Sequence, residues 1–561
     1  MDKDNTENEL FEKNIHALSK KNRELGFRLS RTTAKISNYK FLPSRTGELV
    51  PNWLDQQGAA HSLHSMMDPR KEARRLIETV QSESFVVLLG LGAGFYAEEA
   101  LKREESGFVL AVEYDLRSLA ELFHSIDYTS LFEDPRFRLA VDLSGEELQQ
   151  FILSLYQPVL YGGIKVIPLR SRTGLLPESF ISAAKATEGA IDQLSSDYSV
   201  QARFGKRWLS NILRNLKNTC TAQGSIPPIK RAAVCAAGPS LSLQIPAIQK
   251  TRKDKFLIAV DTSLPCLLNA GIKPDAVISI DCQHISYYHF MDGLPEGVLL
   301  FLDLASPPLL ASRSKSFQFF TSAHPLTRYI SRLWKPLPEL DTSGGNVTYA
   351  AVALAEQMGA GEIELYGADF SYPGGVSYAR GTYIYSFFAK HQNRLSPLEA
   401  QCSEFLYRTP LEKISAQAKS GSWYYENRLL KFYRQRLEEK SLCMEAELFP
   451  VEGLGAPICA KQAESRKQNL RTFSYGKAAT QAEDFLLFYK NKIASLPKPE
   501  KSAALYLELL SDEEKAVFTT ILPLAAAIKN RNSISGFREL IEEAKAYTIK
   551  QIDKTLADYN S

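Results

Sequence analysis

A series of short apolar runs in the middle of the chain constrains the fold most. They are rich in β-branched and aromatic residues and show little polar alternation, which predicts strands covered on both faces. Helix-forming segments separate them, and strands that alternate with helices favour a parallel sheet. The predicted strands are AAVCA (232–236), FLIAV (256–260), AVISI (276–280), VLLFL (298–302), FQFF (317–320) and EIELY (362–366).

A second α/β unit is predicted nearer the N-terminus. SFVVLLG (84–90) has the composition of a buried strand, LGAGFYAEEALKREE (91–105) predicts a turn and helix, and FVLAVEYD (108–115) predicts a second strand. The glycines of this turn (90, 92 and 94) and Glu113 at the end of the next strand match a methyltransferase or dinucleotide fingerprint. The two interpretations are an S-adenosylmethionine or NAD site and a structural or substrate-recognising unit.

The chain of 561 residues is long enough for three or four domains of about 150 residues each. Apolar residues at helical spacing in 198–218 predict a connector helix, and Pro227-Pro228 ends it. Residues 47–80 predict an irregular or hairpin segment followed by a helix near 69–80, and Ser511 with Glu514 predicts a capped helix. The expected parts are an N-terminal extension (1–80), a Rossmann-like domain with the connector helix (81–225), a catalytic domain (226–400), a connecting segment (401–464) and a helical domain (465–561).

Composition excludes several classes of protein. The formal net charge of +3 is too small to indicate nucleic acid or a membrane surface as the main partner. Seven cysteines without a CxxC pair argue against a disulfide framework or a zinc site. The sequence shows no apolar signal region and no apolar stretch of about 18 residues. We therefore expect a cytoplasmic protein without nucleic-acid partners or membrane insertion.

Acidic side chains follow several predicted strands. Asp261, Asp281 and Asp303 come at or just after strand ends, and Asp369 follows EIELY by way of Gly367-Ala368. Ligands of open parallel sheets bind beyond the carboxyl ends of the strands, so these acids predict a site there. The alternative is that each acid only caps the following turn or helix.

Three turns at the same sheet edge predict a nucleotide site. Thr342-Ser343-Gly344-Gly345-Asn346 precedes a predicted helix, whose free N–H groups and dipole suit a phosphate, although an ordinary N-cap would look the same. Tyr372, Tyr378, Tyr383 and Tyr385 surround a glycine-rich loop, where phenols could hold a phosphate or simply pack. The Gly238-Pro239-Ser240 turn has one glycine and a proline without an N–H, which suits a single phosphate better than a pyrophosphate. Together they predict a nucleoside monophosphate unit.

These motifs resemble a known family. GPSL (238–241), NAGIKPDAVISID (269–281) and TSGGNVTYAAVALAEQMGAGEIELYGADFSY (342–372) look like the motility accessory factor proteins, whose core resembles bacterial sialyltransferases. The resemblance is densest over 230–385 and extends over most of the chain. It implies two Rossmann-like parallel-sheet units, the central one sialyltransferase-like, and a helical C-terminal domain. It also implies transfer of a nonulosonic acid, of pseudaminic or legionaminic type, from a CMP-activated donor to serine or threonine of flagellin.

The resemblance assigns a donor site residue by residue. Tyr378 matches a phosphate-binding tyrosine, whereas its companion falls on Ser371 with Tyr372 one place later, so either could serve. Ala236-Ala237 replaces a segment that carries a base-binding asparagine in the sialyltransferases. The resemblance implies that Gly238, Pro239, Ser240, Thr342, Ser343, Gly344, Tyr372 and Tyr378 bind the donor. The strand ends and the turn before the helix add Asp261, Thr262, Gly345, Asn346 and Asp369 to the predicted donor-binding residues.

The attacking hydroxyl needs a proton acceptor, for which Asp281 with His284 is the preferred assignment and His324 and His391 are further candidates. No cofactor or metal is expected beyond the CMP-sugar, although the strand-end acids leave a metal role open. A magnesium-dependent 6-hydroxymethylpterin pyrophosphokinase shares a GPSL-type core and is one alternative. A non-catalytic flagellin-binding chaperone is another. The tail after about residue 465 is expected to recognise flagellin.

Overall fold

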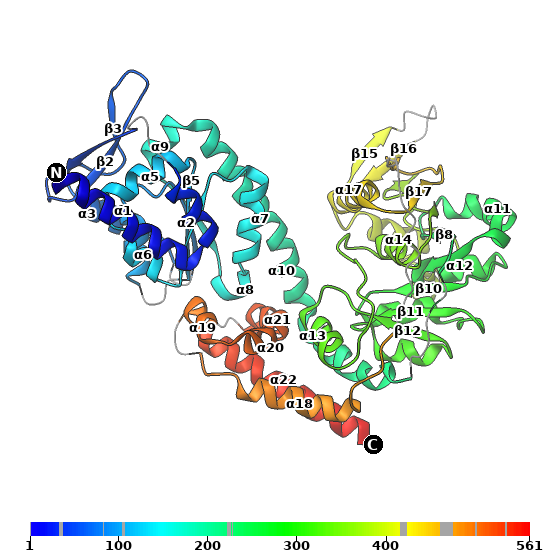
Figure 1. Cartoon of the computed structure of the whole chain (residues 1–561). Helices are drawn as coiled ribbons and strands as arrows, with labels where there is room; N and C mark the ends of the chain where they lie inside the picture. The colour runs from blue at the N-terminus through cyan, green and yellow to red at the C-terminus, as the bar shows by residue number, and fades with distance from the viewer. Residues whose placement is uncertain are drawn as a thin grey trace. The chain divides into compact units, whose positions relative to one another are not determined.

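The computed structural model describes residues 2–32, 38–81, 84–103, 107–221, 226, 228–415, 423–460, 475–499, 502–532 and 536–560. It contains two compact units, Met1–Gly205 with Ser495–Ala546 and Lys206–Ala494 with Tyr547–Ser561. Both carry parallel sheets and the C-terminal region is helical, which confirms the predicted fold class (Figure 1). The C-terminal helices, predicted as one domain, are divided between the units.

The first unit begins with helices and a small antiparallel sheet. Strands β2 (Leu49–Leu54) and β3 (Ala60–Ser62) form a hairpin in the segment for which a hairpin was one of two expectations, and β1 (Tyr39–Pro43), which precedes that segment, pairs with β2. The helix predicted near 69–80 is α3 (Pro69–Ile77), whose first turn Asp68 caps by accepting the Lys71 N–H at 2.8 Å. The helices before the parallel sheet are α1 (Asp2–Lys21), α2 (Arg23–Ser30) and α3.

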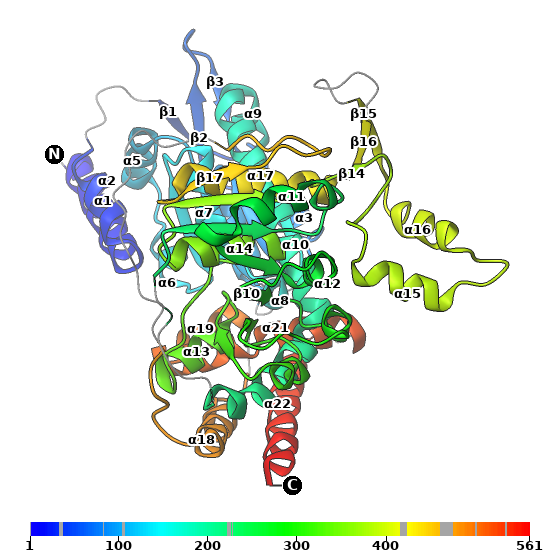
Figure 2. The same cartoon turned by 90° about the vertical axis from the view of Figure 1, so that its right-hand side faces the viewer.

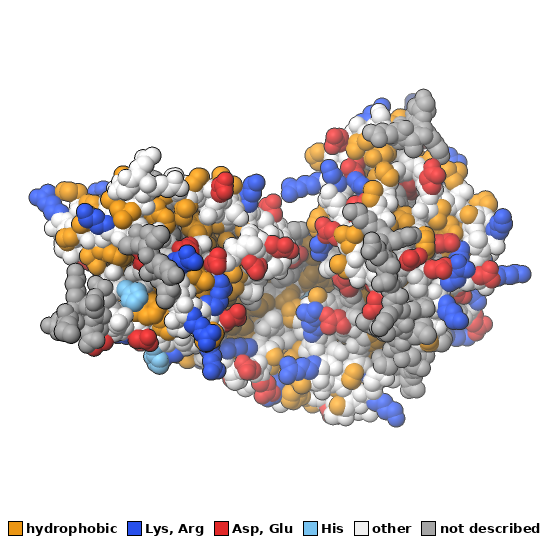
Figure 3. All heavy atoms as spheres, turned by 45° about the horizontal axis from the view of Figure 1, so that its top comes forward, with side chains coloured by type: hydrophobic (Ala, Val, Ile, Leu, Met, Phe, Trp, Pro, Cys, Tyr) orange, Lys and Arg blue, Asp and Glu red, His pale blue; other side chains and the backbone are white. Residues whose placement is uncertain are grey.

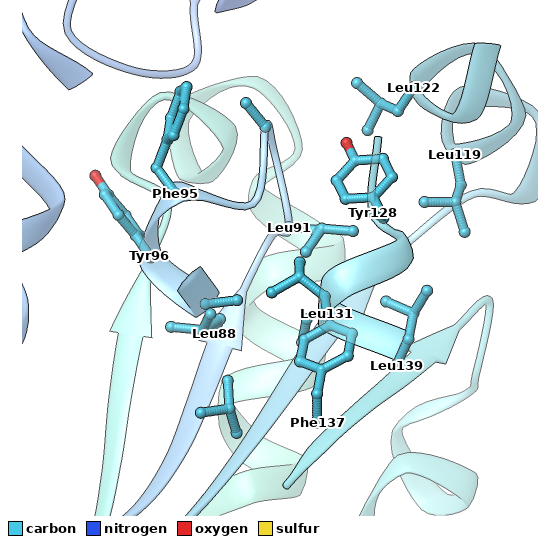
Figure 4. Close-up of a cluster of buried hydrophobic side chains, with 14 of the residues drawn as sticks. Leu88, Leu91, Phe95, Tyr96, Leu119, Leu122, Tyr128, Leu131, Phe137 and Leu139 are labelled. Atoms are coloured by element: carbon cyan, nitrogen blue, oxygen red, sulfur yellow. The ribbon is translucent and has the colours of Figure 1, made fainter. Parts of the chain in front are cut away.

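The parallel sheet of the first unit has the order β6-β5-β4-β7. Its apolar strands pack with the surrounding helices into one core, to which Leu88, Phe95, Leu122, Tyr128 and Phe137 belong (Figure 4). Its strands are β4 (Phe85–Leu89), β5 (Phe108–Glu113), β6 (Phe137–Val141) and β7 (Ile164–Pro168). Its helices are α4 (Phe95–Leu101), α5 (Leu116–Ser125), α6 (Thr129–Glu133), α7 (Gly145–Leu155), α8 (Pro158–Tyr161) and α9 (Arg170–Leu175).

The predicted connector helix is α10 (Pro177–Thr219), and the division between the units falls within it. A Cβ at Gly205 would clash with the Pro523 carbonyl oxygen, so only glycine allows α10 this close an approach to the C-terminal helices of the first unit. The predicted capping box is confirmed, since Ser511 and Glu514 each bind the other's backbone N–H. The C-terminal helices are α18 (Ala482–Ser495), α19 (Ala503–Leu509), α20 (Asp512–Thr520), α21 (Leu522–Asn532) and α22 (Phe537–Asn560).

The second unit is built on a seven-stranded parallel sheet in the order β12-β11-β10-β9-β8-β13-β17. The predicted strands are confirmed with small shifts at their ends, and β17 was not predicted. From β8 the chain adds β9 to β12 toward one edge and then returns to β13 on the other side of β8. The strands are β8 (Arg231–Cys235), β9 (Phe256–Val260), β10 (Ala276–Ser279), β11 (Leu299–Asp303), β12 (Phe317–Phe320), β13 (Glu362–Tyr366) and β17 (Glu447–Pro450).

Helices cover this sheet, and a smaller segment extends from it. The alanine-rich α14 packs across β8, β9 and β10. Figure 2 shows α15 and α16 extending from the sheet with β14 (Tyr372–Pro373), β15 (Glu412–Ser415) and β16 (Trp423–Glu426). The other helices are α11 (Leu241–Thr251), η1 (Arg252–Asp254), η2 (Asp261–Ser263), α12 (Leu264–Asn269), η3 (His284–Phe290), η4 (Pro308–Arg313), α13 (Pro325–Leu333), α14 (Val347–Gln357), α15 (Tyr383–His391), α16 (Leu398–Leu406) and α17 (Arg428–Cys443).

The surface carries charges of both signs. Lysine and arginine are interspersed with aspartate and glutamate over the face shown in Figure 3, in keeping with the formal net charge of +3. Among the described helices, none combines the length and the apolar character that a bilayer span requires.

Candidate active site

The backbone of the glycine turn in the first unit forms hydrogen bonds with side chains of the same unit. The Leu91 N–H donates to Glu113 Oε1 at 2.7 Å, and the Ala93 N–H donates to His64 Nε2 at 2.9 Å. The Tyr128 hydroxyl donates to the Gly92 carbonyl at 2.6 Å. Glu113 and the N–H groups of Leu91 and Ala93 therefore already have partners within the protein, which favours the structural interpretation of this unit.

His64 makes the stability of this turn depend on pH. Burial lowers the pKa of His64 from 6.5 to about 3, so the unfolded chain binds the proton first as the pH falls. The contribution of the neutral, buried His64 to the free energy of unfolding is fully present above pH 6.5. It declines by about 1.4 kcal/mol per pH unit as the pH falls from 6.5 toward 3. We expect the free energy of unfolding to fall between pH 7 and pH 5 by about 2 kcal/mol more in the native protein than in His64→Gln. Urea titrations at both pH values measure this, and equal pH dependence in the two proteins would contradict the assignment.

In the second unit, the order of the strands reverses at β8 and β13, where ligands of such sheets bind. The Gly238-Pro239-Ser240 turn follows β8 and is bonded to the loop after β13. The Gly238 N–H donates to the Gly367 carbonyl at 2.8 Å, and the Ser240 N–H donates to Asp369 Oδ2 at 2.9 Å. The Ser240 hydroxyl also donates to Asp369. Burial raises the pKa of Asp369, although the hydrogen bonds from Ser240 favour its ionised form.

The loop after β17 (451–456) packs on this turn. The Leu454 N–H donates to Ser240 Oγ at 2.7 Å, and the Ala456 N–H donates to the Asp369 carbonyl at 3.0 Å. Gln244 of α11 donates to the Glu452 carbonyl at 3.0 Å. Ser240 and Asp369, both predicted to bind the nucleotide, thus hold the turn and the loop together. Gly238 and Pro239 are half-buried and keep part of the turn accessible.

Asp303 behaves as the capping alternative predicts. It is buried, it accepts the Ala305 N–H at 2.7 Å, and burial raises its pKa to about 6.

The backbone carbonyls of the loops after β10 and β11 accept hydrogen bonds from α10. Asn211 of α10 donates to the carbonyls of Cys282 and Ala305 at 3.1 and 2.8 Å, and Asn215 donates to those of Leu304 and Ser306. The loops after β10 and β11 are therefore fixed by α10.

Asp261 and Asp281 form the acidic part of the site. The Ser279 hydroxyl donates to Asp261 Oδ2 at 2.6 Å, and the Thr262 N–H and hydroxyl donate to Asp261 Oδ1 at 2.7 and 3.1 Å. Asp281 accepts the Gln283 N–H at 2.9 Å. Burial raises the pKa of Asp281, and the neighbouring charge of Asp261 adds to this. These carboxylates at the ends of β9 and β10 are thus close enough to influence each other.

Of the three histidines predicted as possible proton acceptors, two are exposed and the third caps a helix. His284, predicted to act with Asp281, is exposed, and His391 is exposed at the end of α15. His324 caps α13 by accepting the Leu326 N–H at 3.1 Å, and burial lowers its pKa to about 3. His289 was not singled out from the sequence, yet it is buried with Nε2 4.0 Å from Asp261 Oδ1. Its position beside His284 in one short segment gave no signal as to which faces inward.

The predicted phosphate turn has a defined hydrogen-bond pattern. Asn346 caps α14 by accepting the Tyr349 N–H at 3.0 Å. Asp341 accepts the Ser343 N–H at 3.0 Å and the Tyr349 hydroxyl at 2.7 Å. Burial opposes ionisation of Asp341, but these hydrogen bonds outweigh it and lower its pKa to about 2. Lys440 lies 3.4 Å from Asp341 and offsets its charge.

Tyr378 connects the phosphate turn to the acidic part of the site. Burial raises the pKa of its hydroxyl, and Tyr383, Tyr372, Asp261 and Tyr433 are near enough to add to the shift. Gly345 lies against Tyr433, since a Cβ there would be 3.1 Å from that ring. The turn, the tyrosines and Asp261 therefore belong to one region.

Two further tyrosines shape this region. The Tyr385 hydroxyl donates to the Tyr378 carbonyl at 2.8 Å and holds the loop. Tyr372 is half-buried in β14, with Ser371 buried beside it and bonded to the Asp369 carbonyl. Within the described ranges, no three histidine, cysteine, aspartate or glutamate side chains are grouped as metal ligands would be.

Parts of the chain resemble known proteins in sequence, and the whole chain resembles a known protein in fold. Residues 206–375 match the family described as 6-hydroxymethylpterin diphosphokinase MptE-like. The solved structure of a MAf glycosyltransferase from Magnetospirillum magneticum AMB-1 has the same fold, with a TM-score of 0.59 and 13% identity over 98% of this chain and 95% of that one. This confirms the α/β fold with parallel sheets and a helical C-terminal region that the motility accessory factor resemblance implies.

Sequence relatives occur in Treponema pallidum (strain Nichols). One uncharacterised protein is 36% identical over 156 residues, which are 27% of this chain and 54% of that protein. Another is 33% identical over 165 residues, which are 29% of this chain and 79% of that protein. The chain therefore belongs to the same family as this second uncharacterised protein of Treponema pallidum.

Proposed function

We propose that the chain is a glycosyltransferase that moves a nonulosonic acid, of pseudaminic or legionaminic type, from a CMP-activated donor to serine or threonine of flagellin. The observation that carries the proposal is the fold shared over nearly the whole chain with a MAf glycosyltransferase. The two-unit architecture and the helical C-terminal region are both included in that match. We place the reaction in the cytoplasm, with flagellin and the CMP-sugar as the partners.

The donor phosphate is proposed to lie between the Thr342–Asn346 turn and Tyr378. The helix that follows the turn directs its dipole and first N–H groups toward an anion. Among the described residues, the N–H groups of Gly344 and Asn346 have no hydrogen-bond partner. Tyr378 stays neutral because burial raises its pKa, so it can donate to the phosphate without adding charge.

The group that leaves with the electron pair is CMP, whose phosphate these donors stabilise. This makes a metal ion unnecessary for the proposed transfer. The acceptor hydroxyl loses its proton as its oxygen bonds to the anomeric carbon, so a basic group must lie near the phosphate. The sequence predicts Asp281 with His284 for this role; burial raises the pKa of Asp281, whereas His284 is exposed, so the base has to be identified from the geometry of the site.

A pterin pyrophosphokinase is the second candidate, because the MptE-like family matches residues 206–375. That match covers the core of the second unit only. Two of the acids that could bind magnesium already accept hydrogen bonds: Asp303 from the Ala305 N–H and Asp369 from the Ser240 N–H. These contacts support the glycosyltransferase over the kinase.

Calorimetry and mass spectrometry separate the candidates. We expect the purified protein to bind CMP and to add the mass of one or more nonulosonic acids to purified flagellin supplied with the CMP-sugar. Binding of Mg-ATP with pyrophosphorylation of 6-hydroxymethylpterin would instead establish the kinase. Flagellin binding without CMP binding or transfer would identify a chaperone.

A further inference from the structure

His289 is held in an unusual setting at the carboxyl edge of the second sheet. Its side chain is 8% exposed, and Nδ1 is enclosed with no hydrogen-bond partner among the residues that the structure describes. Buried polar atoms are almost always paired, because an unpaired one costs free energy. The setting therefore points to a use for the imidazole.

Asp261 faces the other nitrogen of this ring. Nε2 of His289 lies 4.0 Å from Asp261 Oδ1, too far for a hydrogen bond but close enough for strong attraction between opposite charges. Donors from Ser279 and Thr262 hold the carboxylate in place. Asp281 also interacts electrostatically with His289. A positive charge formed on the imidazole would thus be stabilised by two carboxylates.

Tyr383 fixes the plane of the ring and links it to the donor site. The two rings are 4.5 Å apart at 85°, an edge-to-face contact. Tyr383 begins α15 and interacts electrostatically with Tyr378, to which the donor phosphate is assigned. Asp261 interacts with Tyr378 as well. The His289–Asp261 pair therefore lies beside the proposed phosphate site.

We infer that His289 is the proton acceptor of the proposed transfer, with Asp261 as the residue that stabilises its charged form. The inference rests on the proposed function and names the base that it requires. Because Nδ1 is enclosed, Nε2 is the nitrogen that a substrate can reach. As the acceptor oxygen bonds to the anomeric carbon, its proton passes to Nε2. The bond from that carbon to the phosphate oxygen breaks, and CMP leaves with the electron pair.

The test compares His289→Asn, His289→Ala and His61→Asn, the last an exposed histidine of the first unit, paired with Asp55. CMP affinity, measured by calorimetry, is expected to stay within about twofold in all three variants. The kcat for sugar transfer from the CMP-nonulosonic acid to flagellin should fall about 100-fold or more in both His289 variants and stay unchanged in His61→Asn. Added imidazole should restore part of the activity of His289→Ala, which a purely structural role would not allow.

Asp261→Asn should lower kcat by a larger factor than it changes the KM for the donor, because Asp261 acts on the charge of His289. Native kcat in both His289 variants would overturn the inference, as would a loss that imidazole does not restore in a variant that still binds CMP. Absence of transfer by the native protein with CMP binding intact would remove the proposed function and the inference with it. Transfer by the native protein with unaffected His289 variants would remove the inference alone.

Discussion

Replacing Gly238 by alanine is expected to destabilise the second unit by about 3 kcal/mol. A Cβ at this position would lie 2.5 Å from the Gly367 carbonyl oxygen and would also clash with the Asp369 carboxylate. The carbonyl oxygen is backbone and already accepts the Gly238 N–H, so it cannot move away without breaking that bond. The glycine of the Gly-Pro-Ser turn is thus required for the close approach of the loops after β8 and β13.

Urea denaturation followed by tryptophan fluorescence measures this loss. Gly163→Ala is the matched control, because a Cβ there meets nothing within 4 Å and the residue is not in the left-handed region. The control should unfold at the native midpoint. A Gly238→Ala protein as stable as the control would mean that the two loops separate easily, and the turn would then not be fixed in the way described.

Tyr378→Phe is expected to weaken CMP binding about 10- to 150-fold. A hydrogen bond to a charged group is worth about 1.5–3 kcal/mol, which gives this range. Among the described residues the Tyr378 hydroxyl has no hydrogen-bond partner, so its removal should leave the fold intact. Cytidine, which lacks the phosphate, should bind the variant almost as well as the native protein. Ser343→Ala should act in the same direction but less, because backbone N–H groups of the turn remain.

Calorimetry with CMP and with cytidine distinguishes the phosphate contact from a general loss of the site. Tyr407→Phe is a suitable control, since this phenol is exposed on the surface, where its hydroxyl contacts Tyr425. The control should bind CMP normally. Unchanged CMP affinity in both Tyr378→Phe and Ser343→Ala would mean that the phosphate is bound elsewhere. Equal losses for CMP and cytidine would place Tyr378 against the nucleoside instead.

The strands of both parallel sheets could be predicted because a strand buried on both faces is apolar throughout. FLIAV and FQFF match β9 and β12 at both ends. The strand β17 could not, because ELFP begins with a charged residue, ends in proline and becomes a strand through its pairing with β13. Its following loop then covers the Gly-Pro-Ser turn, a contact between residues more than 200 positions apart that no local pattern reveals.

The candidate site could likewise be predicted only in part, because contacts between distant segments decide which side chains face it. The strand-end acids, the Thr342–Asn346 turn and the tyrosines were found from sequence because parallel strands end at one edge. Which side chain faces inward was not predictable, so His284 was chosen where the fold buries His289. The glycine turn of the first unit matched a cofactor fingerprint. However, His64, which is distant in the sequence, accepts a hydrogen bond from the Ala93 N–H of that turn.

Intact-mass spectrometry of flagellin tests the central claim most directly. Flagellin is purified from a strain that lacks this protein and from the same strain carrying either the native gene or the Tyr378→Phe variant. The account predicts that flagellin from the deletion strain is lighter by one or more nonulosonic-acid residues, that the native gene restores this mass, and that the variant restores it incompletely. Flagellin of identical mass with and without the protein would contradict the claim that the chain glycosylates it.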